Sequence, residues 1–173
     1  FPYTTLFRSR EYDRGIRATY LLHGITGSGK TEVYLHLMEK VLLRDPEAQV
    51  LLMVPEINLT PQLVERVQSR FPQLEVDSWN SGMAEGQKAS SWLACHEGRA
   101  RILVGTRLSV FASFKSLKLI LVDEEHDPSF KSQEGVRYNA RDLALKRASI
   151  EQIPIVLGSA TPSLRSEEHT SEL

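Results

Sequence analysis

The strongest constraint on this chain is a glycine-rich turn that joins an apolar stretch to an amphipathic one. In LLHGITGSGKTEVY, four residues separate Gly24 from the run Gly29, Lys30, Thr31. This is the spacing of a phosphate-binding loop, whose glycines let successive backbone N–H groups face anionic oxygens. The lysine reaches the β- and γ-phosphates, and the threonine hydroxyl is a ligand for Mg²⁺. The pattern predicts a nucleotide site formed by Gly24, Thr26, Gly27, Ser28, Gly29, Lys30 and Thr31.

The residues on both sides of this turn fit the same interpretation. Residues 19–23 are apolar enough for a short buried strand, and residues 31–43 carry apolar side chains at helical spacing. A phosphate-binding loop requires a strand before it and a helix after it. The alternative, a flexible Gly/Ser loop without a ligand, requires neither element.

Strand and helix patterns continue to alternate along the chain. Further strands are predicted at residues 48–55, 74–79, 101–107, 117–126 and 153–162, and further helices at residues 60–71, 84–98 and 140–151. Thr60 and Pro61 are suited to a helix start, and Gly98 to a helix end. Alternation of this kind predicts an α/β fold, with a mostly parallel sheet and helices on both faces.

The strand predicted at residues 117–126 ends in acid. In LILVDEEH, Asp123 follows four apolar residues, as a Walker B aspartate does, and its carboxylate could hold Mg²⁺. Glu124 would then be the base that deprotonates the attacking water. The alternative is an acidic helix N-terminus without a metal. His126 alone is as compatible with a structural as with a catalytic role.

Composition excludes several classes of protein. With 173 residues, 41% hydrophobic and 25% charged, the chain has the make-up of one soluble globular domain. We expect no membrane partner and a cytoplasmic location, because no apolar run is long enough for a membrane span or a secretory signal. The net charge of −1 gives no evidence for nucleic-acid binding. Cys95 and His96 are too few for a zinc site, so Cys95 is interpreted as an ordinary helix residue.

The two ends of the chain differ from the rest. Residues 1–9 and 165–173 resemble translated sequencing adapters, so the natural segment is expected at about residues 10–164. The alternative is that both are natural polar tails.

Three motifs in order, GSGKT, DEEH and GSAT, resemble those of superfamily 2 DNA helicases. The resemblance is closer to the PriA family of primosomal replication-restart helicases, and it covers nearly everything between the two ends. It is carried by GITGSGKTEVYL, VPEINLTPQLVERVQSRF, VGTRLSVFASF, LILVDEEHDPSFKSQEGVRYNARDLAL and IPIVLGSATPSL. It implies that the fold is the first RecA-like P-loop NTPase lobe of a helicase motor.

The resemblance also implies roles for single residues. ATP and Mg²⁺ would be the cofactors, with catalytic roles for Lys30, Asp123 and Glu124. Coupling of hydrolysis to movement would involve His126, Ser159 and Thr161. The path of single-stranded DNA would include Pro55, Glu56, Thr106 and Arg107.

Residues 127–142 resemble the aromatic-rich loop of that family, which links DNA to the ATP site. Phe130 and Tyr138 could stack on bases, while phosphates would meet Lys131, Arg137 and Arg141. The alternative is a surface loop with two anchoring aromatic residues. Two positions depart from the family, because Asn80 and Asn139 stand where histidine is usual.

A motor of this kind needs a second lobe, which supplies an arginine finger. We therefore expect this chain by itself to hydrolyse ATP very slowly and not to unwind DNA. The family's zinc module is absent from the sequence, so no zinc is expected. The resemblance implies 3′-to-5′ translocation at replication forks near the nucleoid, with primosome proteins and single-strand-binding protein as partners. Two alternatives are a small-molecule kinase and an isolated lobe that binds a nucleotide or a partner without catalysis.

Overall fold

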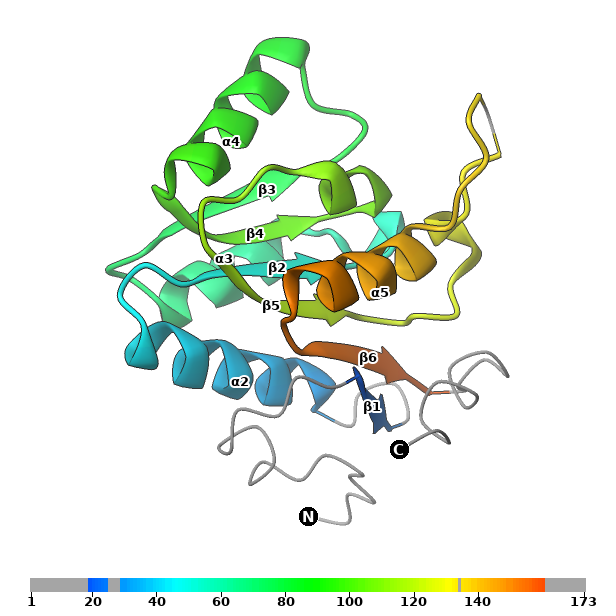
Figure 1. Ribbon diagram of the computed structural model, residues 1–173. Helices are drawn as coiled ribbons and strands as arrows, with labels where there is room; N and C mark the ends of the chain where they lie inside the picture. The colour runs from blue at the N-terminus through cyan, green and yellow to red at the C-terminus, as the bar shows by residue number, and fades with distance from the viewer. Residues whose placement is uncertain (1–18, 25–28, 134, 161–173) are drawn as a thin grey trace.

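A parallel six-stranded sheet forms the centre of the molecule, seen in a computed structural model that describes residues 19–24, 29–133 and 135–160 (Figure 1). The strand order is β1-β6-β5-β2-β4-β3, and every neighbouring pair is parallel. The strands are β1 (Thr19–His23), β2 (Gln49–Met53), β3 (Glu75–Trp79), β4 (Ala100–Gly105), β5 (Leu117–Val122) and β6 (Ile155–Ser159). The α-helices are α2 (Lys30–Arg44), α3 (Pro61–Arg70), α4 (Glu85–Glu97) and α5 (Ala140–Glu151). Short 3₁₀ turns are η1 (Glu56–Asn58), η2 (Arg107–Phe111) and η3 (Pro128–Phe130).

The predicted α/β fold with a parallel sheet is confirmed, and so are the helix boundaries that have a local cause. Thr60 caps α3, because its hydroxyl accepts a hydrogen bond from the backbone N–H of Leu63 at 3.2 Å. Gly98 ends α4 in the left-handed conformation, with φ 80°. The strand predicted to run to His126 is shorter, because β5 ends at Val122 and the acidic residues form the turn that follows.

Each face of the sheet has its own hydrophobic core. In β2, Val50 and Leu52 point toward α2 and α3, whereas Leu51 and Met53 point toward α4 and α5. This alternation follows from the two-residue period of a strand. Both faces are covered, so the inner strands β2, β4, β5 and β6 are largely apolar, whereas the edge strand β3 (EVDSW) is more polar and less buried.

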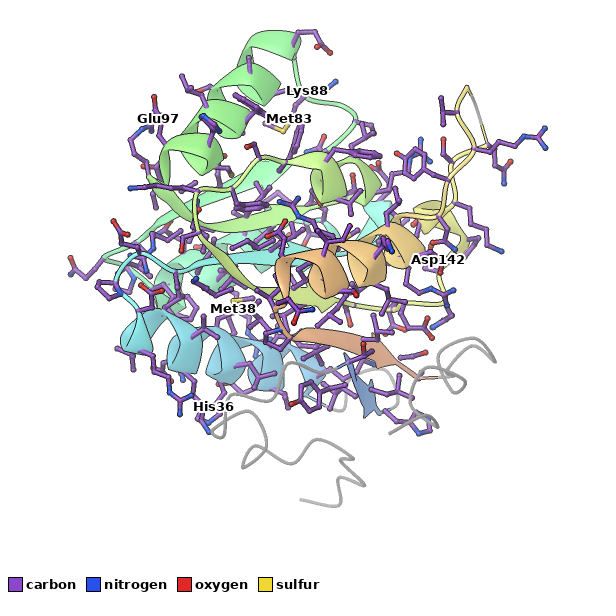
Figure 2. All side chains as sticks on the ribbon, viewed as in Figure 1. His36, Met38, Met83, Lys88, Glu97 and Asp142 are labelled. Atoms are coloured by element: carbon purple, nitrogen blue, oxygen red, sulfur yellow. The ribbon has the colours of Figure 1, made fainter. Side chains whose placement is uncertain are left out.

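Helix α2 shows the same sorting of side chains. Met38 is fully buried against the sheet, whereas His36 lies on the solvent side of the helix (Figure 2). Of the helices in the described parts of the chain, none has the length and apolar character that a bilayer crossing requires.

Cys95 is packed within α4 and is completely buried. Burial, with the negative charge of Asp77 second, raises the pKa of its thiol to about 12. The interpretation of Cys95 as an ordinary helix residue is confirmed.

All six carboxyl ends of the strands meet at one edge of the sheet, because the strands are parallel. Backbone hydrogen bonds tie the segments beyond these ends together: Gly24 N to Ser159 O (3.1 Å), Asp123 N to Met53 O (2.8 Å) and Glu125 N to Gly158 O (2.9 Å). Ligands of doubly wound sheets bind at this edge. The fold thus brings together the three motifs that lie far apart in the sequence.

Candidate nucleotide site and nucleic-acid interface

Lys30 is the first residue of α2, and its ammonium group lies between the glycine turn and the acidic turn. Its Nζ donates to the carbonyl of Gly24 at 2.7 Å and is 3.1 Å from Oε1 of Glu124. Gly29 precedes it with φ 84°, a left-handed conformation that favours glycine. Lys30 is buried, so its charge is held at a fixed place at the edge of the sheet. The structure thus places Lys30 beside Glu124, while the catalytic roles of both residues stay predictions.

Part of the predicted site lies outside the described residues, namely Thr26, Gly27, Ser28 and Thr161. Thr31 is half-buried in the first turn of α2, directly after Lys30. Its role as a ligand for Mg²⁺ stays a prediction.

Asp123 follows β5 and is held by a residue that sequence reasoning missed. The hydroxyl of Tyr34 donates a hydrogen bond of 2.9 Å to Oδ1 of Asp123. Burial raises the pKa of Asp123, while the hydrogen bond from Tyr34 acts in the opposite direction. Burial and the Asp123 carboxylate both raise the pKa of Tyr34 well above its ordinary value, so the phenol remains a donor. A sequence signal existed, because Tyr34 is four residues after Lys30 and so on the same helix face.

Glu124 has an unusual backbone. Its φ is 46°, in the left-handed region that non-glycine residues seldom adopt. The turn directs its carboxylate toward Lys30, and its side chain keeps 18% exposure. Strain of this kind costs about 1–3 kcal/mol and is typical of functional sites.

Glu125 points in the opposite direction, into the protein. Its Oε2 accepts a 2.8 Å hydrogen bond from Arg141 on α5, and both residues are buried. Arg141 also pairs with Asp142 at 2.6 Å. Burial lowers the pKa of Arg141, but hydrogen bonds to the two carboxylates more than offset this, so the pKa is raised. The interpretation of Arg141 as a phosphate contact is therefore wrong, because its guanidinium is taken up inside the fold.

His126 joins two of the motifs. Its Nδ1 is 2.7 Å from the hydroxyl oxygen of Ser159 at the end of β6, and its Nε2 is 3.8 Å from Oε2 of Glu124. The role of His126 and Ser159 in coupling hydrolysis to movement stays a prediction. In that role, the contacts of His126 would link Glu124 to the end of β6.

The chemistry of the donor set fits a magnesium–nucleotide complex. Mg²⁺ in such sites is held by one or two carboxylates together with phosphate oxygens and water. Within the described residues no group of three or more His, Cys, Asp or Glu side chains could hold a metal alone. Asp123 offers one carboxylate, whose Oδ1 accepts the hydrogen bond from Tyr34, and Glu124 is the next residue in the chain. The residues present thus suit a metal that arrives with its phosphates.

The aromatic residues predicted to stack on DNA bases belong to the protein core. Phe130 is 1% exposed and packs in the core on the α4 and α5 face, so its assignment as a base-stacking residue is wrong. Tyr138 is partly buried, meets Phe111 edge to face at 5.2 Å and has a buried hydroxyl. The alternative of a surface loop with two anchoring aromatic residues describes this segment better.

The segment that carries these residues extends away from the body of the protein (Figure 1). Lys131 and Asn139 pair across its base, and Ser132 N donates to Tyr138 O at 2.8 Å. The side chains of Lys131 and Arg137 are exposed. Of the three cations predicted to contact phosphates in this segment, only Lys131 and Arg137 are therefore exposed.

The remaining predicted DNA contacts divide by burial. Pro55 and Thr106 are buried, and Thr106 Oγ1 has no hydrogen-bond partner in the described parts of the chain. Direct contact through these two side chains is therefore not available in this structure. Glu56 and Arg107 keep intermediate exposure and stay predictions.

The two asparagines that replace the usual histidines have local structural roles. Asn139 caps α5, because its Oδ1 accepts from Arg141 N at 3.0 Å. Asn80 Oδ1 accepts from Gly82 N at 2.9 Å, which closes the turn after β3.

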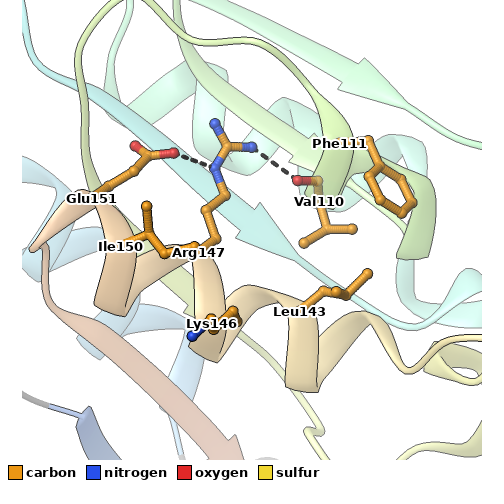
Figure 3. Close-up of a pocket in the computed structure, with 7 residues that line it drawn as sticks. All are labelled: Val110, Phe111, Leu143, Lys146, Arg147, Ile150 and Glu151. Atoms are coloured by element: carbon orange, nitrogen blue, oxygen red, sulfur yellow. Dashed lines mark hydrogen bonds and ion pairs between the residues drawn. The ribbon is translucent and has the colours of Figure 1, made fainter.

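An apolar pocket of about 310 Å³ lies between η2 and α5 (Figure 3). Arg147 crosses it, donating to Val110 O at 2.8 Å and to Glu151 Oε1 at 2.6 Å. None of its lining residues belongs to the predicted site; they are Val110, Phe111, Leu143, Lys146, Arg147, Ile150 and Glu151.

Solved structures support the fold. The chain superposes on the helicase MrfA bound to DNA and AMPPNP with a TM-score of 0.66 and 17% identity, covering 94% of this chain and 24% of that one. It superposes on yeast Dbp5 bound to RNA and ADP BeF3 with a TM-score of 0.62 and 20% identity, covering 90% and 39%. At such low identity these likenesses establish a RecA-like lobe and nothing more.

Curated relatives confirm the resemblance to PriA. The chain is 50% identical over 147 residues to replication restart protein PriA of Bacillus subtilis, covering 85% of this chain and 18% of the relative. With PriA of Haemophilus influenzae it shares 46% over 147 residues, covering 85% and 20%. The chain thus spans about a fifth of the length of these relatives.

The family comparison covers nearly the whole chain. The DEAD/DEAH box helicase family matches residues 15–170, which include all six strands and all three motifs. This match argues against the kinase alternative. The chain belongs to the DEAD/DEAH box helicase family.

Proposed function

We propose that this chain is the ATP-binding motor lobe of a PriA-like DNA helicase that acts in replication restart. The observation that carries the proposal is the contact of Lys30 with both Gly24 and Glu124 at the carboxyl edge of the sheet. The 50% identity to a replication restart protein adds the biological context. Translocation from 3′ to 5′ on single-stranded DNA, action at forks, and primosome and single-strand-binding partners follow from the resemblance to that family.

In this proposal Lys30 exchanges its contacts when a nucleotide binds. Its ammonium leaves Glu124 for the β- and γ-phosphates, since a polyanion is the stronger partner. Mg²⁺ bound with the phosphates would neutralise charge that develops during phosphoryl transfer. Thr31 and Asp123 would hold that ion, and Glu124, released from Lys30, would accept the proton of the attacking water.

The isolated lobe is expected to bind a nucleotide but to hydrolyse it very slowly. An arginine supplied from a second lobe contributes about 10³–10⁵ in rate to enzymes of this class. Residues 10–164 would form the lobe, with residues 1–9 and 165–173 as tails of adapter origin. The parent protein would contain the second lobe and would be the active ATP-dependent helicase. A soluble, nucleoid-associated location in bacteria belongs to the same proposal, and no zinc is assigned to this segment.

The nucleic-acid contacts proposed for this lobe are those with exposed or half-exposed side chains. They are Glu56, Arg107, Lys131 and Arg137. Lys131 and Arg137, on the projecting segment, would contact phosphates. Their contribution to DNA affinity would therefore depend on salt concentration.

The test is a titration of Mg-ATP with the wild-type chain and with Lys30→Ala, followed by ATPase assays with and without single-stranded DNA. A lost charged hydrogen bond is worth about 1.5–3 kcal/mol, so Lys30→Ala should weaken binding about 10- to 100-fold. Lys118→Ala is the matched control, because that exposed lysine lies at the start of β5, at the opposite edge of the sheet.

Three results would contradict parts of the proposal. Equal affinity of the wild type and Lys30→Ala would remove the nucleotide site. DNA-stimulated turnover by the 173-residue chain would show that it completes its own active site. Strand separation by the purified chain would contradict the need for a second lobe.

A further inference from the structure

Within residues 19–24, 29–133 and 135–160, the hydroxyl of Tyr34 has one hydrogen-bond partner, and that partner is the carboxylate proposed to hold the metal. Tyr34 is 1% exposed, and its O–H donates to Oδ1 of Asp123 at 2.9 Å. The backbone of Asp123 is fixed at the same time, because its N–H donates to Met53 O at 2.8 Å. Both ends of the Asp123 residue are therefore held.

We propose that Tyr34 is a positioning residue for the metal site: its hydrogen bond to Oδ1 fixes the orientation of the Asp123 carboxylate, which would hold Mg²⁺. This inference rests on the proposed function, since it concerns the same magnesium–nucleotide site. A carboxylate that is fixed before binding loses less conformational freedom when the metal arrives. Partners that orient a metal ligand commonly change metal affinity 10- to 100-fold.

Helix α2 connects the Tyr34–Asp123 hydrogen bond to the residues proposed to bind the phosphates. Lys30 begins the helix, Thr31 follows, and Tyr34 lies one turn later on the side of Lys30. Helix α2 thus carries Lys30, proposed to contact phosphate, and Thr31, a proposed metal ligand. It also carries Tyr34, which orients Asp123, the proposed metal ligand that follows β5. The distance between the two halves of the site is set by the packing of α2 on the sheet.

Gly158 provides the space for the Tyr34 hydroxyl. A Cβ added at Gly158 would overlap that hydroxyl and would lie 3.5 Å from Oδ1 of Asp123. Gly158 lies within β6 and is not among the glycines with positive φ, so its backbone does not require glycine. The glycine of the GSAT motif is therefore explained by the Tyr34–Asp123 contact.

The experiment measures metal binding separately from nucleotide binding in the 173-residue chain. Mn²⁺ replaces Mg²⁺ as the probe, and its affinity for the chain–ADP complex is followed by electron paramagnetic resonance. ADP affinity is measured in parallel with EDTA present. We compare the wild type with Tyr34→Phe and Gly158→Ala, and thermal unfolding reports whether each variant folds.

Tyr34→Phe should weaken Mn²⁺ binding about tenfold, in line with the loss of a hydrogen bond to a charged group, and leave metal-free ADP affinity within about twofold. Gly158→Ala should weaken Mn²⁺ binding in the same direction, because its methyl displaces the hydroxyl while the Tyr34 side chain is retained. It also keeps the test decisive if Tyr34→Phe fails to fold. Ser109→Ala is the control, since it deletes another buried hydroxyl, bonded to Thr106 O at 2.6 Å, outside the site.

The inference is overturned if folded Tyr34→Phe binds Mn²⁺ as tightly as the wild type does. It is also overturned if Mn²⁺ and metal-free ADP affinities fall by the same factor, which would indicate general damage to the site. If the wild-type chain binds no nucleotide, the proposed function itself fails and this inference with it. The wild-type titration therefore distinguishes the two failures.

Discussion

Glu124 and Glu125 are neighbours in the sequence, yet they occupy opposite environments. Glu124 faces the edge of the sheet, keeps 18% exposure and pairs with Lys30, which must change partner in the proposed cycle. Glu125 is inside the fold and pairs with Arg141, whose side chain is 6% exposed. The left-handed backbone of Glu124 is the turn that separates them. Two glutamates in succession thus form different contacts, Glu124 with Lys30 at the edge of the sheet and Glu125 with Arg141 in the interior. The positive φ of Glu124 directs the two side chains apart.

The inner pair also connects two regions of the protein. Arg141 belongs to the first turn of α5, directly after the projecting segment that carries Lys131 and Arg137. Asp142, the second partner of Arg141, lies on the same helix turn (Figure 2). The Glu125–Arg141 contact therefore anchors the end of this segment beside the acidic turn.

The largest expected effect comes from removing the inner carboxylate. Glu125→Ala leaves the buried Arg141 charge without its main partner, and breaking such a pair costs about 3–5 kcal/mol of unfolding free energy. Glu124→Ala should lower the same quantity by less, because Glu124 keeps 18% exposure and Lys30 retains its 2.7 Å hydrogen bond to Gly24 O. Urea unfolding of both variants gives the values. Equal losses would remove the distinction between the two glutamates.

The next effect concerns Cys95, which is buried in the hydrophobic core on the α4 and α5 face of the sheet. The folded-state pKa of its thiol, about 12, lies above the unfolded value of roughly 8.5, so the unfolded chain releases this proton first as pH rises. Stability from the neutral thiol is complete below pH 8.5 and declines up to pH 12, by at most about 1.4 kcal/mol per pH unit.

Unfolding free energies of the wild type and Cys95→Ala between pH 7 and 10 measure this slope. The variant should lose stability less steeply with pH, whatever its stability at neutral pH. Parallel slopes would mean that the thiol is not shielded by the fold as the structure indicates.

A smaller effect of opposite sign is expected at the turn itself. Glu124→Gly removes the left-handed strain, and after the entropy of glycine is subtracted its unfolding free energy should be about 0.5–1 kcal/mol higher than that of Glu124→Ala, which lacks the same Lys30 contact. Glu124→Ala keeps the strain and serves as the control. A Glu124→Gly chain less stable than Glu124→Ala would show that the left-handed turn is held at no cost, which would contradict strain at Glu124.

The smallest effect is expected for an ion pair on the surface. Arg66 contacts Glu32 at 3.2 Å, and both side chains are more than half exposed. Arg66→Ala should change the unfolding free energy by less than about 1 kcal/mol and less still at high salt, where screening is strong. A change as large as that of Glu125→Ala would mean that burial does not decide the strength of ion pairs in this protein.

Most of the fold could be predicted because its signals are local. The apolar strands, the Thr60 cap, the Gly98 stop and the glycine turn each depend on residues close in sequence. The motifs GSGKT, DEEH and GSAT are also local, and their order in the chain indicated the helicase family. The prediction that Phe130 stacks on bases was wrong, because Phe130 is buried in the core. The sequence pattern of an aromatic residue in a loop is the same whether its side chain is exposed or packed.

The sequence by itself determined the alternation of elements, the glycine-rich turn before α2 and the acidic turn after an apolar strand. Only the tertiary structure decided which acid faces the site, that Tyr34 holds Asp123, that Gly158 makes room for it and that Arg141 is internal. These are contacts between residues far apart in the chain, 89 positions in the case of Tyr34 and Asp123. Their geometry depends on how helices pack on the sheet, which local pattern does not encode.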